Sequence, residues 1–104
     1  MINFIKTENA FNKVLKRGIK DAETVNILFT SPYDKASQAI LRELKEGNHH
    51  IKDGLNVVDS FDTPHAFVAC DTTQVPCLIN IYKRKKNIEY YVPFIYEKLG
   101  VFLP

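Results

Sequence analysis

The sequence feature that most constrains the fold is a junction where an apolar strand runs directly into a helix start. Residues 24–30 are apolar on both faces except at Asn26, as expected of a central strand covered by helices on both sides. The next residues are Ser31-Pro32-Tyr33-Asp34, where serine has the chemistry of an N-cap, proline fits the first helical position and aspartate suits the first turn. We therefore predict a helix that begins at Pro32 and leaves Ser31 and Tyr33 at an exposed corner.

The segment before this junction predicts one strand and one helix. Apolar and polar residues alternate over residues 1–6, which favours a short strand at a sheet edge. Phe11, Val14 and Leu15 then recur at helical spacing and lie on one face of a helix over residues 8–17. Glycine commonly follows the last residue of a helix, so we expect this helix to stop at Gly18.

The segment after the junction adds three strands and two helices. The junction helix carries an apolar stripe and should end near Gly47. The further elements are a strand at 55–59, a helix at 64–70, strands at 77–82 and 88–92 joined by a basic turn at 83–87, and a helix at 93–99. Residues 66–70 fit an extended segment equally well. The order predicts one α/β domain over residues 1–104, a sandwich with a central mixed sheet of four or five strands flanked by helices.

Two motifs resemble those of the thioredoxin and glutaredoxin family. In that family a Cys-Pro-Tyr-Cys motif occupies a strand-to-helix corner and its first cysteine is the nucleophile, whereas this chain has Ser31-Pro32-Tyr33-Asp34. Residues 73–81, with Val75-Pro76 among them, look like the family's cis-proline loop and the strand that follows it. Pro76 follows Asp34 by 42 positions, close to the family's spacing. The resemblance implies a thioredoxin-like sandwich and a cis bond before Pro76.

The chain departs from the family's pattern at the residues that carry its redox chemistry. Dithiol exchange needs a thiolate nucleophile and a second, resolving thiol. Positions 31 and 34 offer a hydroxyl and a carboxylate, and the strand before them holds Asn26 where the resemblance implies a buried acid. We therefore do not expect dithiol oxidoreductase activity through this motif.

The resemblance implies instead that the corner is retained as a surface that binds a protein partner. In the redox family this surface receives extended peptides beside the cis-proline. The expected binding residues are Ser31, Pro32, Tyr33, Asp34, Val75 and Pro76. Tyr33 should be exposed and belong to the partner site, because the apolar stripe of the following helix points away from it.

A thiol enzyme of a different design is the alternative. Ser31 resembles the serine with which some glutathione transferases bind the glutathione thiolate. Under this alternative the cofactor is glutathione, whereas the protein-binding function needs no cofactor. Cys77 directly follows the proline and is the better candidate of the two cysteines for a single nucleophile. Free cysteines are most often inert buried residues, which we favour for both Cys70 and Cys77, although seven residues would also allow a disulfide between them.

Charge and composition argue against several other functions. A net charge of +2 does not by itself predict membrane or nucleic-acid binding, and we expect the basic run 83–86 to be a solvated turn rather than a contact for phosphate or an acidic partner. No metal site is expected, because the three histidines have no ligand spacing. No apolar run approaches the roughly 20 residues of a membrane span, and no secretory leader is visible, so we expect a cytoplasmic protein. Lysine outnumbers arginine 11 to 3, which favours a low-GC bacterium or one of its phages.

Overall fold

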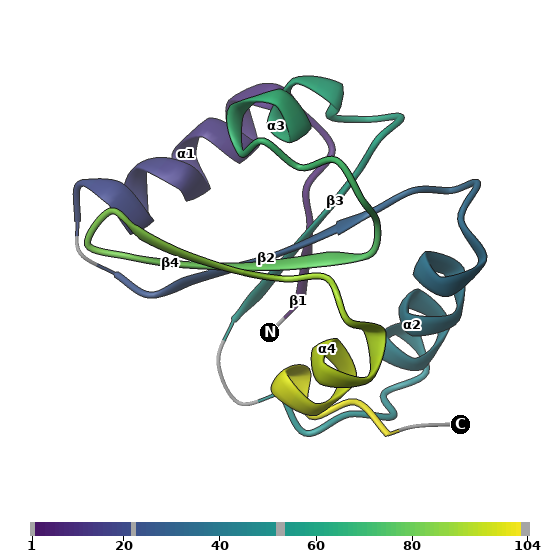
Figure 1. Cartoon of the computed structure of the whole chain (residues 1–104). Helices are drawn as coiled ribbons and strands as arrows, with labels where there is room; N and C mark the ends of the chain where they lie inside the picture. Colours follow the sequence, from purple (N-terminus) through teal and green to yellow (C-terminus); the bar gives the residue numbers. More distant parts are fainter. Residues whose placement is uncertain (1, 22, 52–53, 103–104) are drawn as a thin grey trace.

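The computed structural model describes residues 2–21, 23–51 and 54–102 and contains five strands and four helices among them (Figure 1). Their bounds in chain order are β1 Ile2–Phe4, α1 Glu8–Ile19, β2 Val25–Thr30, α2 Lys35–Lys45, β3 Leu55–Asp59, α3 Pro64–Ala69, β4 Cys77–Tyr82, β5 Lys85–Glu89 and α4 Val92–Leu99. The predicted α/β order is confirmed, and the third predicted helix, not an extended segment, occupies residues 64–69.

All five strands form one mixed sheet in the order β1-β3-β2-β4-β5. β3 is parallel to both β1 and β2, as crossover helices require, whereas β4 is antiparallel to β2 and forms a hairpin with β5. β2 therefore lies at the centre of the sheet, where the apolar sequence of residues 24–30 places it. The two edges are the short β1 and the polar β5.

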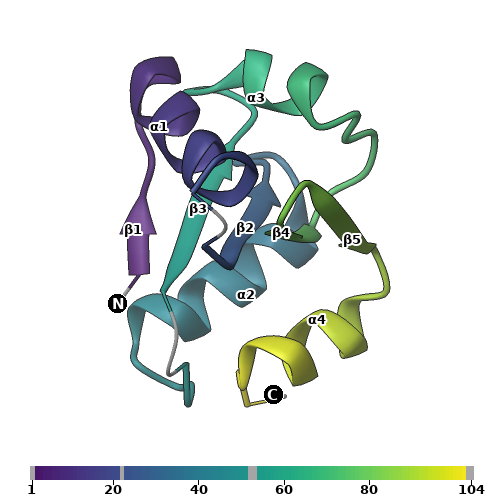
Figure 2. The same cartoon turned by 90° about the vertical axis from the view of Figure 1, so that its left-hand side faces the viewer.

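Helices cover the sheet on both faces, α1 and α3 on one side and α2 and α4 on the other (Figures 1 and 2). The alternation of side chains along β2 supplies both layers, because successive residues point to opposite faces. Ile27 and Phe29 join the core beneath α1 and α3, while Leu28 joins the core beneath α2 and α4. The three side chains are completely buried.

The prediction that α1 stops at Gly18 is wrong. The helix continues to Ile19, and the N–H of its C-cap residue Lys20 donates to the Lys16 carbonyl. Gly18 is buried against β4, where a Cβ atom would lie 3.0 Å from Ile81 Cγ2. The local sequence predicts that Gly18 ends the helix, but in the structure this glycine allows α1 to pack closely on the sheet. The local sequence does not reveal this role.

The predicted bounds of β4, 77–82, are confirmed, whereas those of the hairpin turn and of β5 are wrong. The turn consists of Lys83 and Arg84, both with positive φ, and β5 begins directly after it at Lys85. Positive φ at both central residues is the geometry of a tight two-residue hairpin turn. Three of the five residues of the expected basic turn are therefore strand, and the strand ends earlier than predicted, at Glu89.

Candidate functional site

The corner between β2 and α2 is built by two competing capping residues. Asp34 Oδ2 accepts from the Ser37 backbone N–H at 2.7 Å, so Asp34 is the N-cap and α2 begins at Lys35. The prediction that Ser31 is the cap and Pro32 the first helical residue is therefore wrong. Both serine and aspartate cap helices well, and the charged aspartate gains additionally from the positive end of the helix dipole.

Ser31 lies in a turn that precedes the helix. The Asp34 N–H donates to the Ser31 carbonyl at 3.2 Å and closes the turn, and the Ser31 N–H donates to Ser37 Oγ at 3.2 Å. Ser31 Oγ accepts from the Tyr33 N–H and from the Ser60 hydroxyl, each at 3.2 Å. Neither partner is a base, so nothing in this bonding activates the hydroxyl as a nucleophile.

Tyr33 projects from this turn into solvent. Its exposed fraction is 85%, which confirms the predicted exposure. The loop after β3 contributes a second aromatic side chain, Phe61, with an exposed fraction of 73%. Sequence reasoning missed Phe61, whose only local signal is an apolar residue inside the polar turn Asp59-Ser60-Phe61-Asp62.

The loop after β3 is held against the corner. The Ser60 N–H donates to the Thr30 carbonyl at 3.1 Å, in addition to the bond between the two serine hydroxyls. Asp59 Oδ1 accepts from the N–H groups of Phe61 and Asp62 at 2.8 and 2.7 Å, which fixes the backbone that carries Phe61. The two exposed aromatics therefore stand on loops that are joined by hydrogen bonds.

The Val75–Pro76 peptide bond is cis, as predicted. Cys77 pairs with Phe29 in the antiparallel ladder between β4 and β2, so Pro76 lies opposite the last residue of β2, next to Ser31. Pro76 is buried and Val75 is half-buried. Tertiary structure thus brings together the two motifs that lie 42 positions apart in the sequence.

The two cysteines lie beneath this surface and are both buried and free. Burial raises the pKa of the Cys77 thiol to about 11 and raises the pKa of the Cys70 thiol as well. Both side chains are therefore neutral thiols near pH 7, which argues against Cys77 as a thiolate nucleophile. The disulfide left open by the sequence is not formed.

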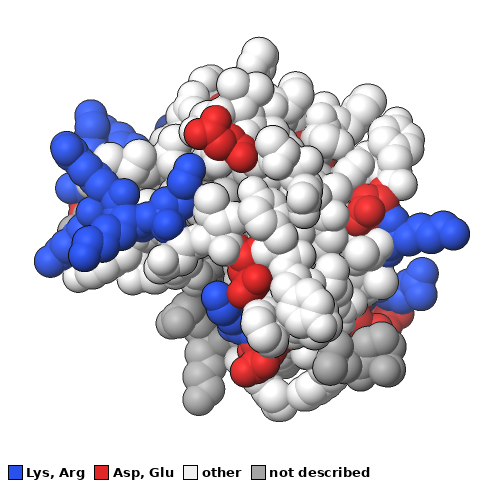
Figure 3. All heavy atoms as spheres, in the orientation of Figure 1, with Lys and Arg blue, Asp and Glu red and all other residues white. Residues whose placement is uncertain are grey.

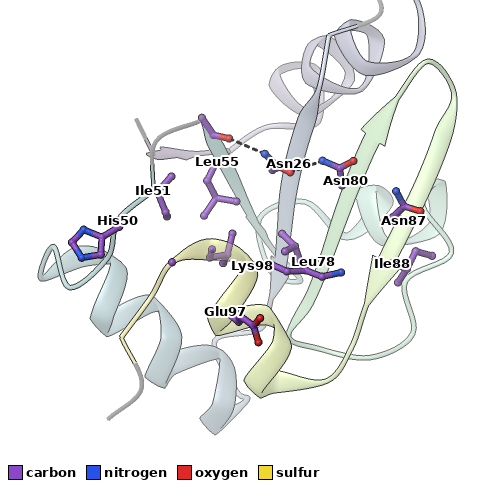
Figure 4. A pocket seen from close by; sticks show the side chains of 13 residues that line it. Asn26, His50, Ile51, Leu55, Leu78, Asn80, Asn87, Ile88, Glu97 and Lys98 are labelled. Carbon is purple, nitrogen blue, oxygen red and sulfur yellow. Dashed lines mark hydrogen bonds between the residues drawn. The ribbon is translucent and has the colours of Figure 1, made fainter.

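A separate hollow of about 680 Å³ lies at the opposite end of β2, between the sheet and α4 (Figure 4). Three asparagines from neighbouring strands line its sheet side, namely Asn26, Asn80 and Asn87. Asn80 Nδ2 donates to Asn26 Oδ1 at 2.8 Å, so part of this polar lining is already satisfied. The hollow is remote from the corner and contributes nothing to that site.

No group of three or more histidine, cysteine or acidic side chains in the described ranges is placed to hold a metal ion. Within the same ranges, no helix has the length and apolar character needed to cross a membrane.

Comparison with known proteins identifies the fold. Thioredoxin O2 of Arabidopsis thaliana matches with a TM-score of 0.72 and 18% identity, covering 95% of this chain and 94% of that chain. Thioredoxins of Trypanosoma brucei brucei and of Saccharomyces cerevisiae mitochondria match with TM-scores of 0.71 and 0.69. They are 14% and 15% identical, with coverage of 94% and 93% of this chain and of 87% and 91% of theirs. No family model and no curated protein matches the sequence.

The protein is thus an α/β protein with a thioredoxin-like fold, a five-stranded mixed sheet flanked by four helices. The predicted fold class is confirmed. At these identities the likeness concerns the fold alone.

Proposed function

We propose that this chain is a redox-inactive protein-binding module in which Ser31-Pro32-Tyr33-Asp34 stands where thioredoxins carry their cysteine motif. The observation that carries this proposal is the placement of cis-Pro76 beside a corner that presents an 85% exposed tyrosine and no thiol. A rigid exposed aromatic is a common anchor of protein interfaces. The binding surface consists of Ser31, Pro32, Tyr33, Asp34, Val75 and Pro76, with Phe61 at its border.

The partner segment is an extended peptide. Among the described residues, none hydrogen-bonds the backbone N–H or C=O of Val75, so these groups are available for strand-like pairing. Tyr33 and Phe61 then supply apolar area on the neighbouring loops. This arrangement favours a peptide with apolar side chains flanking its paired backbone.

Thiol chemistry has little support at this site. Ser31 Oγ is engaged by Tyr33 and Ser60, and the only cysteines of the chain are buried thiols with raised pKa values. We accordingly propose that the module works without a cofactor, in the cytoplasm. Binding of glutathione at Ser31 is the competing function.

Two assays separate these functions. Reduction of insulin by dithiothreitol should proceed at the same rate with and without the protein, and no mixed disulfide should form with oxidised glutathione. Turnover of insulin, or a glutathione adduct on Cys77, would contradict the redox-inactive assignment. Titration with reduced glutathione should leave the amide resonances of residues 31–34 unshifted.

Selection from a displayed library of random linear peptides tests the binding surface directly. Peptides selected on the wild-type protein should lose at least tenfold in affinity for Tyr33→Ala, the scale of about 1.4 kcal/mol that an interface anchor contributes. Tyr91→Ala is the matched control, because Tyr91 is also an exposed tyrosine, 58% accessible, but lies at the start of α4. Peptides that ignore Tyr33 and depend on Tyr91 would place the binding surface elsewhere.

A further inference from the structure

The basic residues of the chain converge on one end of the molecule. Eight of its 14 lysines and arginines lie in α1 or at its C-cap and in the β4–β5 hairpin: Lys13, Lys16, Arg17, Lys20, Lys83, Arg84, Lys85 and Lys86. Figure 3 shows the largest group of cationic side chains at the left, where α1 ends and the hairpin turns in Figure 1. The corner with Ser31 is at the opposite end of β2.

Close packing of α1 on the sheet brings the two segments together. Gly18 lies directly on Ile81, which leaves the last turn of α1 above the end of β4. Ile81 in turn pairs with Lys86 across the hairpin, and Lys86 Nζ donates to the Cys70 carbonyl on the α1 side of the sheet. Cations that are about 65 positions apart in the sequence thereby form one surface, which we call the basic end.

The basic end carries little compensating charge. Residues 9–20 and 77–88 contain no acid, and the nearest acidic residues along the chain are Glu8, Asp21, Glu23 and Glu89. Glu89 pairs with Lys98, and the other ion pair among the described residues joins Lys6 to Asp62. Helix-dipole compensation explains Lys16 and Arg17, and edge protection explains the lysines of β5. Neither explains why both groups gather on one surface.

An exposed aromatic ring, more than the kind of cation, favours nucleic acid over an acidic protein as the ligand of the basic end. Six of the eight cations are lysines and two are arginines, and both residue types bind phosphate as well as carboxylate. Tyr82 adjoins the hairpin turn with 43% of its surface exposed, and Lys83 Nζ lies 5.3 Å from its ring centroid. An exposed aromatic among cations is the combination on which unpaired bases stack.

We propose that the basic end binds single-stranded nucleic acid through its phosphate backbone, with Tyr82 stacking on a base and without sequence specificity. The hairpin cations alone did not predict nucleic-acid binding, because a single basic turn is usually solvated. The four cations of α1, which only the tertiary structure places beside the hairpin, complete the surface. The proposal is independent of peptide binding at the corner.

Fluorescence anisotropy with a labelled oligothymidylate tests the proposal. A length of about 20 nucleotides exceeds the roughly 4–16 nucleotides that one small domain covers. Binding to the full chain should weaken with salt, and the logarithmic slope should be about −0.7 for each phosphate contacted. The hairpin variant Lys83→Gln/Arg84→Gln/Lys85→Gln should bind at least tenfold more weakly and show a slope smaller in magnitude by about 2.

Two further variants make this result specific. Lys35→Gln/Arg42→Gln/Lys45→Gln removes the same charge from exposed positions of α2 and should change the affinity less than twofold. Lys16→Gln/Lys20→Gln removes charge from the end of α1 and should weaken binding although the hairpin is intact. This variant therefore tests the proposal even if the hairpin variant fails to fold. Tyr82→Ala should weaken binding without altering the salt slope.

Several results would overturn the proposal. Absence of binding at about 25 mM salt, where phosphate contacts are strongest, is one. Equal losses of affinity in the hairpin and α2 variants would show that binding depends only on the net charge of the protein. Poly-glutamate that competes as well as unlabelled oligothymidylate would identify an acidic protein as the ligand instead, and a preference for duplex DNA would exclude the stacking role of Tyr82.

Discussion

Asp34 Oδ2 accepts a hydrogen bond of 2.7 Å from the backbone N–H of Ser37, and this single contact decides where α2 begins. It leaves Ser31 to Asp34 as a separate turn, closed by the bond from the Asp34 N–H to the Ser31 carbonyl. The corner is therefore a short rigid loop that precedes the helix. Its exposed residues are positioned by that turn and by Ser60.

Loss of the cap should destabilise the protein by a predictable amount. Asp34→Ala should lower the free energy of unfolding by about 1 kcal/mol, the usual cost of an absent N-cap. Asp34→Asn should stay within a few tenths of a kcal/mol of wild type, because asparagine caps equally well. Urea unfolding measures both. A larger loss from Ser31→Ala than from Asp34→Ala would mean that serine is the cap.

The turn should lower the pKa of a thiol introduced at position 31. In Ser31→Cys, the Tyr33 N–H and the Ser60 hydroxyl are placed to donate to the sulfur, and donors to the charged form favour ionisation. The pKa should fall below the ordinary value of about 8.5, as measured by the alkylation rate against pH in a Cys70→Ala/Cys77→Ala background. Adding Ser60→Ala should raise it again. A pKa that does not respond to Ser60 would contradict this account.

The same turn should accept a disulfide. A turn closed between residues 31 and 34 keeps their Cα atoms within about 7 Å, close to the range that a disulfide spans. Ser31→Cys/Asp34→Cys should therefore oxidise intramolecularly, detectable as a loss of two hydrogen masses, and gain modest insulin reductase activity. Dimers in place of an internal bridge would show that the corner does not have the geometry required for redox function.

Cys77 should make the stability fall at high pH. Its pKa is raised from 9.0 to about 11 by burial, so between these values the unfolded chain loses a proton that the folded protein retains. Ionisation then favours the unfolded state, and the free energy of unfolding should decrease as the pH rises from about 9 towards 11. Cys77→Ala should show a shallower decrease over the same interval, as measured by urea unfolding. Equal slopes would mean that the thiol ionises normally in the folded state.

Gly18→Ala should lower stability even though alanine favours helices. The added Cβ would lie 3.0 Å from Ile81 Cγ2, and overpacking of this kind costs about 1–3 kcal/mol, more than the gain of about 1 kcal/mol in helix propensity. Asn12→Ala, at an exposed position of the same helix, is the control and should stabilise slightly. Thermal unfolding compares the two. A higher melting temperature for Gly18→Ala would show that Ile81 on β4 moves enough to accommodate the added methyl group.

Much of the fold could be predicted from local patterns. The apolar run at β2, the helical spacing of Phe11 and Val14 and the glycine after α4 each act within a few residues, so the sequence alone determined the order of strands and helices. The two motifs that resemble those of thioredoxins also lie in contiguous segments. They were sufficient to predict the sandwich, the cis bond before Pro76 and the exposure of Tyr33.

Only the tertiary structure decided how distant segments share space. Ser31 and Asp34 can both cap a helix, and which of them caps α2 depends on the backbone N–H groups that the helix presents. In the same way, the role of Gly18 depends on its contact with Ile81 across the core. The same holds for Phe61, placed beside the corner by Ser60, and for the joining of α1 to the hairpin at the basic end. Propensity is a property of neighbouring residues, whereas proximity is set by strand register and packing between residues tens of positions apart.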